Sequence, residues 1–304
     1  MEAKGMNVFQ ANICLLCVTF CWSTEVILFA CIPDTVSPFA TTCITSLVGG
    51  ILLFLCFARK VIEAIKKHGK RLFKYVLSLA AMNTVYNLLY IFGLRYFDVS
   101  TGAFMISMTV VILPVILLTL RKKTSIKTWL SAGLVFAGII IVLMRNASIG
   151  QSWGLVFMIL GCLVRAFFIV LLNKTASLFD SLALSSLISL SVGAIAFIPW
   201  LISQPVLFAA IPWNKEIIAS IAIYSYFVVA LAQTLNIVAQ KKSTPANATI
   251  IYSMEIVFSV IWGAILPASI ITPVKITGLI LAGVILVVLG NIIEIIPLGR
   301  TDET

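Results

Sequence analysis

The chain has 304 residues, of which 61% are hydrophobic and only 11% are charged. Soluble globular proteins carry charges on about a quarter of their residues, so this composition excludes that class and predicts a protein that crosses a membrane many times. The formal net charge of +10 does not indicate nucleic acid as a partner, because the basic residues form short clusters between long apolar runs instead of one basic face.

Ten apolar segments that are each long enough to cross a membrane follow one another along the chain. A helix needs about 20 residues to cross about 30 Å of hydrocarbon. We therefore predict an all-α membrane protein with ten transmembrane helices at residues 11–32, 38–58, 75–94, 99–120, 128–145, 152–173, 181–203, 217–240, 245–266 and 274–296. The prolines and tryptophans between residues 199 and 213 predict an interfacial loop over residues 204–216.

The basic residues between these segments predict the orientation of the chain. Seven of the 21 Lys and Arg residues lie between Arg59 and Lys74, and four more lie between Arg121 and Lys127. With ten crossings, one side of the membrane collects 16 basic residues and the other collects 4. The positive-inside rule then places both termini in the cytoplasm of a multi-pass protein, in the cell (inner or plasma) membrane.

The two halves of the chain resemble each other. Residues 133–146 (GLVFAGIIIVLMRN) match residues 278–291 (GLILAGVILVVLGN) at 7 of 14 positions, and residues 107–111 match residues 253–257 at an offset of 146. Five segments separate the equivalents, and because five is odd the second copy enters the membrane from the opposite side. We predict two inverted five-helix repeats, residues 1–148 and 149–304, around a central cavity.

Small residues recur in the fifth and tenth segments. They are Gly133, Ala137, Gly138, Gly278, Ala282 and Gly283. Lipid provides no hydrophobic drive for helices to associate, so small residues that allow close backbone contact are typical of helix interfaces in membranes. We expect these two helices to pack closely against each other.

Several segments resemble a known family. They are the stretch from Leu94 to Leu120, its echo from Ala239 to Leu266, the Cys21-Trp22-Ser23 element and the two G-x-x-x-A-G helices. Together they are similar to an EamA-type member of the drug/metabolite transporter superfamily, over nearly the whole chain. Where such proteins often carry Gly-Glu after the fourth and ninth helices, this chain has Arg121-Lys122-Lys123 and Pro267-Ala268-Ser269. The resemblance implies two inverted halves, with a cavity lined by segments one, three, four, six, eight and nine.

Three ionisable residues lie deep inside apolar segments: Glu25, Arg165 and Glu255. Each charge in mid-membrane costs about 2.5–3.5 kcal/mol on insertion scales, so these groups must face protein or water. They either line an aqueous cavity or form an internal ion pair that only locks helices together. Two carboxylates and one guanidinium leave an excess acid, so one glutamate is expected to be held ionised by Arg165 while the other exchanges a proton. Glu25 and Glu255 are the proton-coupling candidates, with Glu25 preferred.

Two stripes of polar residues also predict an inward face. Asn83, Tyr86, Asn87 and Tyr90 lie at i, i+3, i+4 and i+7 of the third segment, and Tyr226, Gln233, Asn236 and Gln240 form a looser stripe on the eighth. At the repeat offset, Asn87 corresponds to Gln233 and Tyr90 to Asn236. Lipid would leave their amides unsatisfied, so the stripes either line the cavity or form hydrogen bonds between helices.

Aromatic residues complete the candidate substrate-binding set: Trp22, Phe168, Tyr224 and Tyr252. A guanidinium for a carboxylate, a carboxylate for an amine and rings for a side chain favour an amino acid or related zwitterion as substrate. The alternative is efflux of a cationic drug or quaternary ammonium compound, since Thr24-Glu25-Val26 is similar to the membrane glutamate segment of small multidrug resistance proteins.

The remaining function classes find little support. His68 is the only histidine and lies in a basic loop, and the chain has neither a HExxH motif nor a P-loop, so we expect no enzyme, metal site or cofactor. A passive channel stays an alternative, although no TVGYG-like filter is present. The expected partners are a small-molecule substrate, membrane lipid and protons as coupling ion, in a monomer or weak homodimer. The expected activity is transport by alternating access, with export as the direction.

Overall fold

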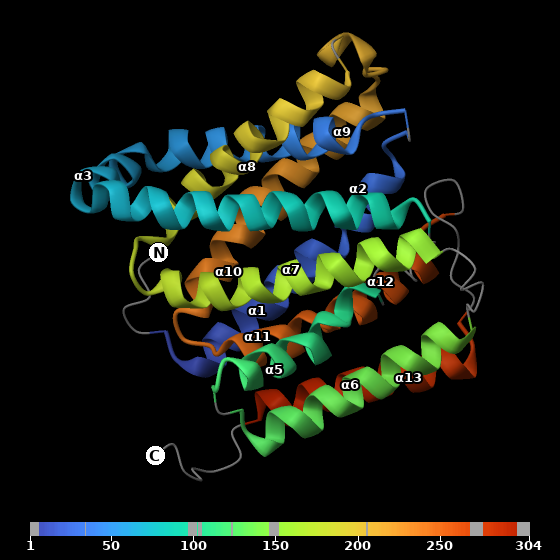
Figure 1. Cartoon of the computed structure of the whole chain (residues 1–304). Coiled ribbons are helices and arrows are strands. Elements are labelled where there is room, and N and C mark those ends of the chain that lie inside the picture. The colour runs from blue at the N-terminus through green and yellow to red at the C-terminus, as the bar shows by residue number, and fades with distance from the viewer. Residues whose placement is uncertain are drawn as a thin grey trace.

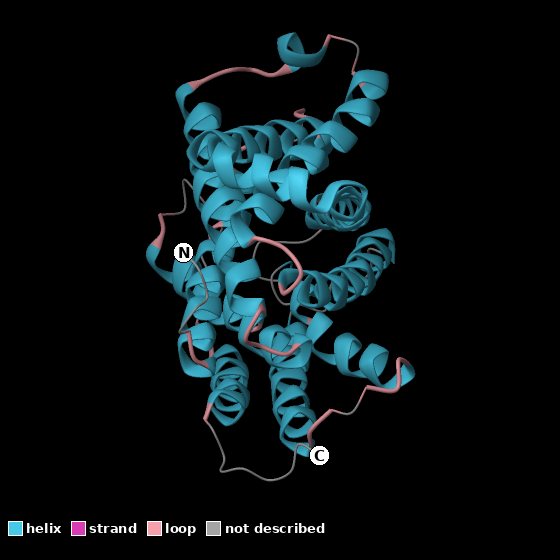
Figure 2. Cartoon of the chain, turned by 90° about the vertical axis from the view of Figure 1, so that its left-hand side faces the viewer, coloured by secondary structure: helices cyan, strands magenta, loops and turns pink. Residues whose placement is uncertain are grey.

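A computed structural model describes residues 6–33, 35–96, 102, 105–122, 124–145, 152–204, 206–267 and 276–296. The described part is built from helices and their connections, with no strand in these ranges (Figure 2). Most helices run roughly parallel or antiparallel to one another, as expected for a bundle in a membrane (Figure 1).

The helices follow the predicted segments closely. Their bounds are α1 Val8–Ser23, α2 Glu25–Ala30, α3 Pro38–Leu94, α5 Thr109–Thr119, α6 Ile126–Arg145, α7 Ser152–Ala176, α8 Ser181–Ser203, α9 Lys215–Ile223, α10 Gln233–Gln240, α11 Pro245–Tyr252, α12 Met254–Ile265 and α13 Gly278–Ile295. Between α9 and α10 the chain forms a π-helix, η2, over Tyr224–Ala232. The predicted loop at 204–216 contains a short 3-10 helix, η1, at Leu207–Ala210.

The structure does not itself give ten crossings. Within the described ranges, seven helices are long and apolar enough to span a membrane, and two shorter apolar helices cover Met105–Thr119 and Ile126–Ile141. The starts of the predicted segments at 99–120 and 274–296 fall on residues outside the described ranges. The predicted segments 38–58 and 75–94 both lie within α3, which has 57 residues.

Helix α3 is bent in its middle. At about 1.5 Å per residue, a straight helix of this length would be nearly three times as long as the hydrocarbon is thick. The backbone leaves helical geometry at Phe57 and at Gly69, whose φ of 45° favours glycine. The two arms fold back beside each other at this bend (Figure 1). The non-helical backbone at Gly69 thus separates two helical arms, which correspond to the two predicted segments.

Polar residues at the segment boundaries determine where several helices begin. The Asp180 carboxylate accepts hydrogen bonds from the backbone N–H of Leu182 and Ala183, at 3.0 Å each, and so caps α8. The Thr244 hydroxyl accepts from the N–H of Asn247, just before Pro245 opens α11. These caps satisfy N–H groups that have no partner within the helix.

Three helices are interrupted inside their apolar segments. The breaks lie at Thr24 between α1 and α2, at Met108 before α5, and at Ser253 between α11 and α12. At each break ψ is close to −15°, and a nearby hydroxyl donates to a carbonyl three residues earlier: Thr24 to Cys21, Thr109 to Ile106 and Ser253 to Ile250. At Cys21 and Ile250 the hydroxyl adds a second donor, because the backbone N–H of Thr24 and of Ser253 donates to the same carbonyl.

Helices α6 and α13 pack side by side (Figure 1). A Cβ added at Gly138 would lie 2.6 Å from the carbonyl oxygen of Gly283, and one at Gly290 would lie 2.8 Å from that of Ser131. The close approach expected from the small residues is therefore present at Gly138 and Gly283. It is absent at Gly133 and Gly278, where an added Cβ would meet nothing within 4 Å, because both lie on open faces of their helices.

The two glycines of α6 give a matched pair for a stability test. Gly138→Ala is expected to lower the free energy of unfolding by about 1–3 kcal/mol, because its Cβ must push α13 away. Gly133→Ala, on the same helix, is expected to have no cost and to gain slightly from its higher helix propensity. Thermal unfolding of the purified variants in detergent measures both, and equal melting temperatures would contradict this account of the interface.

The largest apolar core joins the two halves of the chain. Buried residues of α1, of the second arm of α3, and of α7, α8 and α11 form one cluster, which includes Leu15, Leu79, Leu172 and Ile251. A smaller cluster lies between α6 and α13 and includes Val135 and Val287. Helices of this larger cluster, together with α2, the first arm of α3, η2, α10 and α12, line the site described next.

Candidate functional site

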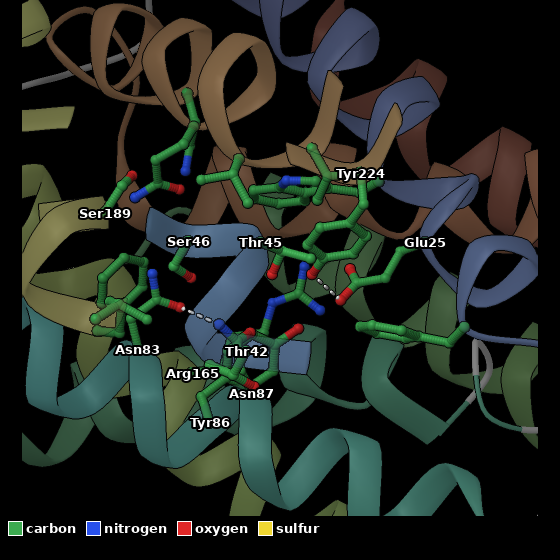
Figure 3. A pocket seen from close by; sticks show the side chains of 18 of the residues that line it. Glu25, Thr42, Thr45, Ser46, Asn83, Tyr86, Asn87, Arg165, Ser189 and Tyr224 are labelled. Carbon is green, nitrogen blue, oxygen red and sulfur yellow. Dashed lines mark hydrogen bonds between the residues drawn. The ribbon is translucent and has the colours of Figure 1, made fainter. Parts of the chain in front are cut away.

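A narrow cavity of about 70 Å³ lies at the centre of the bundle, where α1 and α2 meet α3, α7, α8, η2, α10 and α12 (Figure 3). Eleven of the 13 predicted site residues line it: Trp22, Glu25, Asn83, Tyr86, Asn87, Arg165, Phe168, Tyr224, Gln233, Asn236 and Glu255. At about 10–15 Å³ of such space per water, it has room for about five waters. The residues that the sequence singled out thus share one small polar hollow.

Arg165 of α7 is the buried cation of this cavity. Its side chain is 7% exposed and its guanidinium Nη2 lies 3.7 Å from Oε2 of Glu255, whose side chain is 3% exposed. Three aromatic rings surround the guanidinium: its Cζ lies 5.3 Å from the ring centre of Trp22, 5.4 Å from that of Tyr86 and 5.8 Å from that of Tyr252. A planar guanidinium stacks favourably on such rings, so the cation is held by one carboxylate and an aromatic cage.

Glu25 is the second acid and lies at the break between α1 and α2. It is 6% exposed, and its Oε1 accepts a hydrogen bond of 2.8 Å from the Tyr224 hydroxyl (Figure 3). In the described part of the chain Glu25 forms no salt bridge, whereas Glu255 pairs with Arg165. As the first residue of α2, Glu25 also lies at the helix end where backbone N–H groups favour a negative charge.

The polar stripe on the second arm of α3 faces the cavity over most of its length. Asn83, Tyr86 and Asn87 line the cavity, and the Asn87 amide donates to the Asn83 side-chain oxygen at 3.2 Å. Tyr90 does not line it: its side chain is buried in an apolar cluster with Met105 and stacks on Tyr86, with ring centres 6.1 Å apart. At one further turn along α3, the side chain of Tyr90 lies beyond the end of the cavity.

The stripe on the eighth segment differs from the prediction at its start. Gln233 and Asn236 line the cavity and Gln240 is buried, but the side chain of Tyr226 is 54% exposed. The reason is the π-helix η2, whose wider turn changes the helical register between Tyr226 and Gln233. The same wide turn places Tyr224, Val228 and Val229 at the cavity wall.

Tyr252 of α11 lies at the edge of the site, outside the cavity lining. Its ring centre is 5.0 Å from that of Trp22, and its hydroxyl accepts from the Gln240 amide at 3.0 Å and donates to the Asn236 side-chain oxygen. This network orients Asn236, whose amide nitrogen has no hydrogen-bond partner in the described residues. The Gln233 amide nitrogen is likewise buried without a partner there.

Sequence reasoning missed the cavity wall formed by the first arm of α3 and by α8. Thr42, Thr45 and Ser46 lie at i, i+3 and i+4 of α3, and Ser189 of the neighbouring α8 lies on the same side of the cavity (Figure 3). The spacing of the three hydroxyls was visible in the sequence. The resemblance implied that the fourth segment lines the cavity, but none of the described residues of that segment does. The second and seventh segments, which the resemblance did not include, do line it.

A third buried carboxylate lies outside this site. Glu294 of α13 is 8% exposed and accepts a hydrogen bond of 3.2 Å from the Thr128 hydroxyl of α6. Lys127 donates to the backbone carbonyls of Glu294 and Ile296 at 2.7 and 2.8 Å. These contacts join the ends of α6 and α13, and Glu294 does not line the central cavity.

The site presents both signs of charge within one enclosed space. Guanidinium and unpartnered amide N–H groups can bind a carboxylate, Glu25 can bind an ammonium group, and Trp22, Tyr86 and Phe168 offer apolar surface. Such a site is suited to holding a small polar organic molecule. None of the described residues that line it is a cysteine or a histidine.

Comparison with known proteins gives a family and a fold. A model of the EamA-like transporter family matches residues 10–144 and again residues 152–290. One solved structure, described only as a crystal structure of a protein, has a TM-score of 0.75 and 15% identity, covering 93% of this chain and 96% of its own. At this identity the likeness concerns the fold alone. A search of curated proteins finds no match.

Proposed function

The chain belongs to the EamA-like transporter family, a family of multi-pass membrane transporters with a two-repeat architecture, and we propose that it is a secondary transporter for a small zwitterionic metabolite, an amino acid or a close relative. The observation that carries the proposal is the convergence of Arg165, Glu255 and Glu25 on one enclosed cavity at the centre of the bundle. Export is the proposed direction.

The proposed architecture is ten crossings in two inverted halves, residues 1–148 and 149–304. The two arms of α3 would then be separate crossings joined at the Gly69 bend. Two features support an inverted repeat. The first is that α6 packs against its proposed equivalent α13. The second is that the helix breaks at Met108 and Ser253 lie at equivalent positions to within one residue, when the second repeat is aligned to the first with the offset of 146. A pseudo-two-fold axis would bring such equivalents together.

The small size of the cavity supports alternating access. Room for about five waters is too little for most amino acids with their side chains. For binding and release, the helices around the site would move apart, first toward one side of the membrane and then toward the other. The helix breaks at Thr24 and Ser253 lie next to the two glutamates, where such a movement would act directly on the binding groups.

The charges of the site favour a zwitterion over a cation. A carboxylate can approach Arg165 and the unpartnered amides of Gln233 and Asn236, while an ammonium group can approach Glu25. A quaternary ammonium drug, the competing substrate, would leave these donors unsatisfied and would lie near a second cation. Arg165 has one carboxylate, Glu255, and three neutral aromatic rings around its guanidinium. The positive charge of Arg165 is therefore only partly neutralised and would repel a cationic substrate.

Proton coupling is assigned to Glu25. A buried acid without a salt-bridge partner is favoured in its neutral form, and binding of an ammonium group favours the ionised form. Protonation and substrate binding at Glu25 would then exclude each other, which links proton entry to substrate release. Glu255, held by Arg165, is the weaker candidate.

The proposed setting is the cell membrane, with both termini in the cytoplasm and the chain acting as a monomer or weak homodimer. The excess of basic residues on one side supports this orientation.

A ligand screen tests the substrate class. Thermal unfolding of the purified protein is measured with single amino acids, nucleosides, polyamines and quaternary cations. A ligand at 100 times its dissociation constant stabilises the folded state by about 2.7 kcal/mol, so binders raise the melting temperature. We expect an amino acid to do so, and both its methyl ester and its N-acetyl derivative to fail. Stabilisation by quaternary cations alone would support the drug-efflux alternative.

Counterflow in proteoliposomes separates a carrier from a channel. With the amino acid identified by the screen, we expect saturable uptake of labelled substrate against an excess of unlabelled substrate inside. Non-saturating flux with no counterflow would instead support a passive pore.

A further inference from the structure

The bend of α3 carries the densest positive charge of the molecule. Between Arg59 and Lys74 there are seven basic residues, and Lys66, Lys67, Lys70, Arg71 and Lys74 are all exposed. Among the described residues only Lys60 of this group forms a salt bridge, with Asp180 at 3.9 Å. The other cations of the stretch are therefore available to an anionic partner from outside the chain.

An open groove begins next to two of these lysines. It has a volume of about 490 Å³ and lies between the second arm of α3 and α8, lined by Lys70, Phe73, Lys74, Val76, Leu77 and Ser191. Phe73 and Leu77 are 50% and 59% exposed and alternate with Lys70 and Lys74 at i, i+3, i+4 and i+7 along one face of the helix. Ser191 lies ten residues into α8, about 15 Å from its start, so the groove reaches well into the membrane.

The arrangement fits an amphiphile with an anionic head. Two ammonium groups stand at the mouth of the groove and apolar side chains line its depth, which is the order of charge and hydrocarbon in a phospholipid. Lysine clusters beside a membrane-spanning helix attract anionic lipids, and each lysine near the surface raises the affinity about fivefold. The groove adds a place for an acyl chain, which diffuse attraction lacks.

We infer that this groove is a binding site for one anionic phospholipid, with its phosphate between Lys70 and Lys74 and an acyl chain along Phe73 and Leu77. The bound lipid would lie on the outer wall of α3 and α8, whose inner sides carry Asn83, Asn87 and Ser189 of the central cavity. The inference does not depend on the transported substrate or on proton coupling.

Native mass spectrometry of the detergent-purified protein tests the site. Dioleoyl phosphatidylglycerol and dioleoyl phosphatidylcholine are added in turn to the wild type, to Lys70→Gln/Lys74→Gln, and to the control Lys66→Gln/Lys67→Gln, which removes the same charge from the same helix. We expect the groove variant to bind phosphatidylglycerol about 30-fold more weakly than wild type and the control to lose less than about threefold. Phosphatidylcholine binding is expected to change little in either.

Two further probes keep the outcomes distinct. Leu77→Trp, which fills the groove without changing charge, is expected to weaken phosphatidylglycerol binding, and glycerol phosphate without acyl chains is expected not to bind. Equal losses in the two double variants would show diffuse surface attraction and overturn the site. Should the groove variant fail to elute as a folded protein, Lys74→Gln alone is measured, with an expected loss of about fivefold; unchanged binding there overturns the site as well.

Discussion

Arg165→Met is expected to lower the free energy of unfolding by about 3–5 kcal/mol, the largest stability loss of any substitution considered. The methionine fills much of the space between the rings of Trp22, Tyr86 and Tyr252, so packing is largely kept. What is lost is the cation opposite Glu255, which leaves a buried carboxylate with no countercharge. Denaturant unfolding of the purified variant measures the loss.

The double variant Arg165→Met/Glu255→Gln shows whether the pair is the cause. Replacing both ions by neutral groups removes the unpaired charge, so the double variant is expected to regain most of the stability that the single variant loses. Arg59→Met, at an exposed position of α3, is the control and is expected to stay within about 0.5 kcal/mol of wild type. If the single and double variants are equally unstable, the ion pair is not what holds Arg165 in place.

Glu25→Gln is expected to reduce pH-driven flux in proteoliposomes to the level of protein-free liposomes. Glutamine keeps the size of the side chain and an oxygen that accepts from the Tyr224 hydroxyl, but it cannot exchange a proton. Counterflow of labelled substrate without a pH gradient is expected to persist at reduced affinity, because exchange of substrate for substrate needs no proton. The measurement is uptake of the amino acid found in the screen, with and without an imposed gradient.

Two controls bracket the result for Glu25. Glu216→Gln removes an exposed acid from α9 and is expected to leave both fluxes unchanged. Glu255→Gln is expected to lower counterflow as well as pH-driven flux, because it disturbs Arg165. Unchanged pH-driven flux in Glu25→Gln would remove this residue from the coupling mechanism and direct attention to Glu255.

The helical segments were predictable because hydrocarbon allows few alternatives to a helix. Residues 181–203 were predicted as one crossing, and α8 has the same bounds because Asp180 caps its start. The helical arms of α3 extend beyond the predicted segments 38–58 and 75–94 to the bend at Gly69, which apolar runs did not predict, because the basic residues around His68 mark the end of the apolar surface and not the end of the helix. The π-helix η2 depends on tertiary packing and leaves no pattern in the sequence.

The charged part of the site was predictable for an energetic reason. A charge in the middle of an apolar segment is costly enough that Glu25, Arg165 and Glu255 had to face one another or water, whatever the details of packing. Thr42, Thr45 and Ser46 gave no such indication, because a hydroxyl can satisfy itself on its own helix. Thr45, for example, donates to the carbonyl of Thr41 at 2.7 Å. Small hydroxyl residues are therefore common in membrane helices whether or not they line a site.

The helix breaks place both acids of the site next to a carbonyl that has two hydrogen-bond donors. A helix that flexes within hydrocarbon normally exposes carbonyls that have no replacement partner. The carbonyls of Cys21 and Ile250 each accept from a backbone N–H and from a side-chain hydroxyl, so one donor would remain if flexing removed the other. Local flexing at Thr24 and Ser253, beside Glu25 and Glu255, would therefore cost less than flexing elsewhere in these helices.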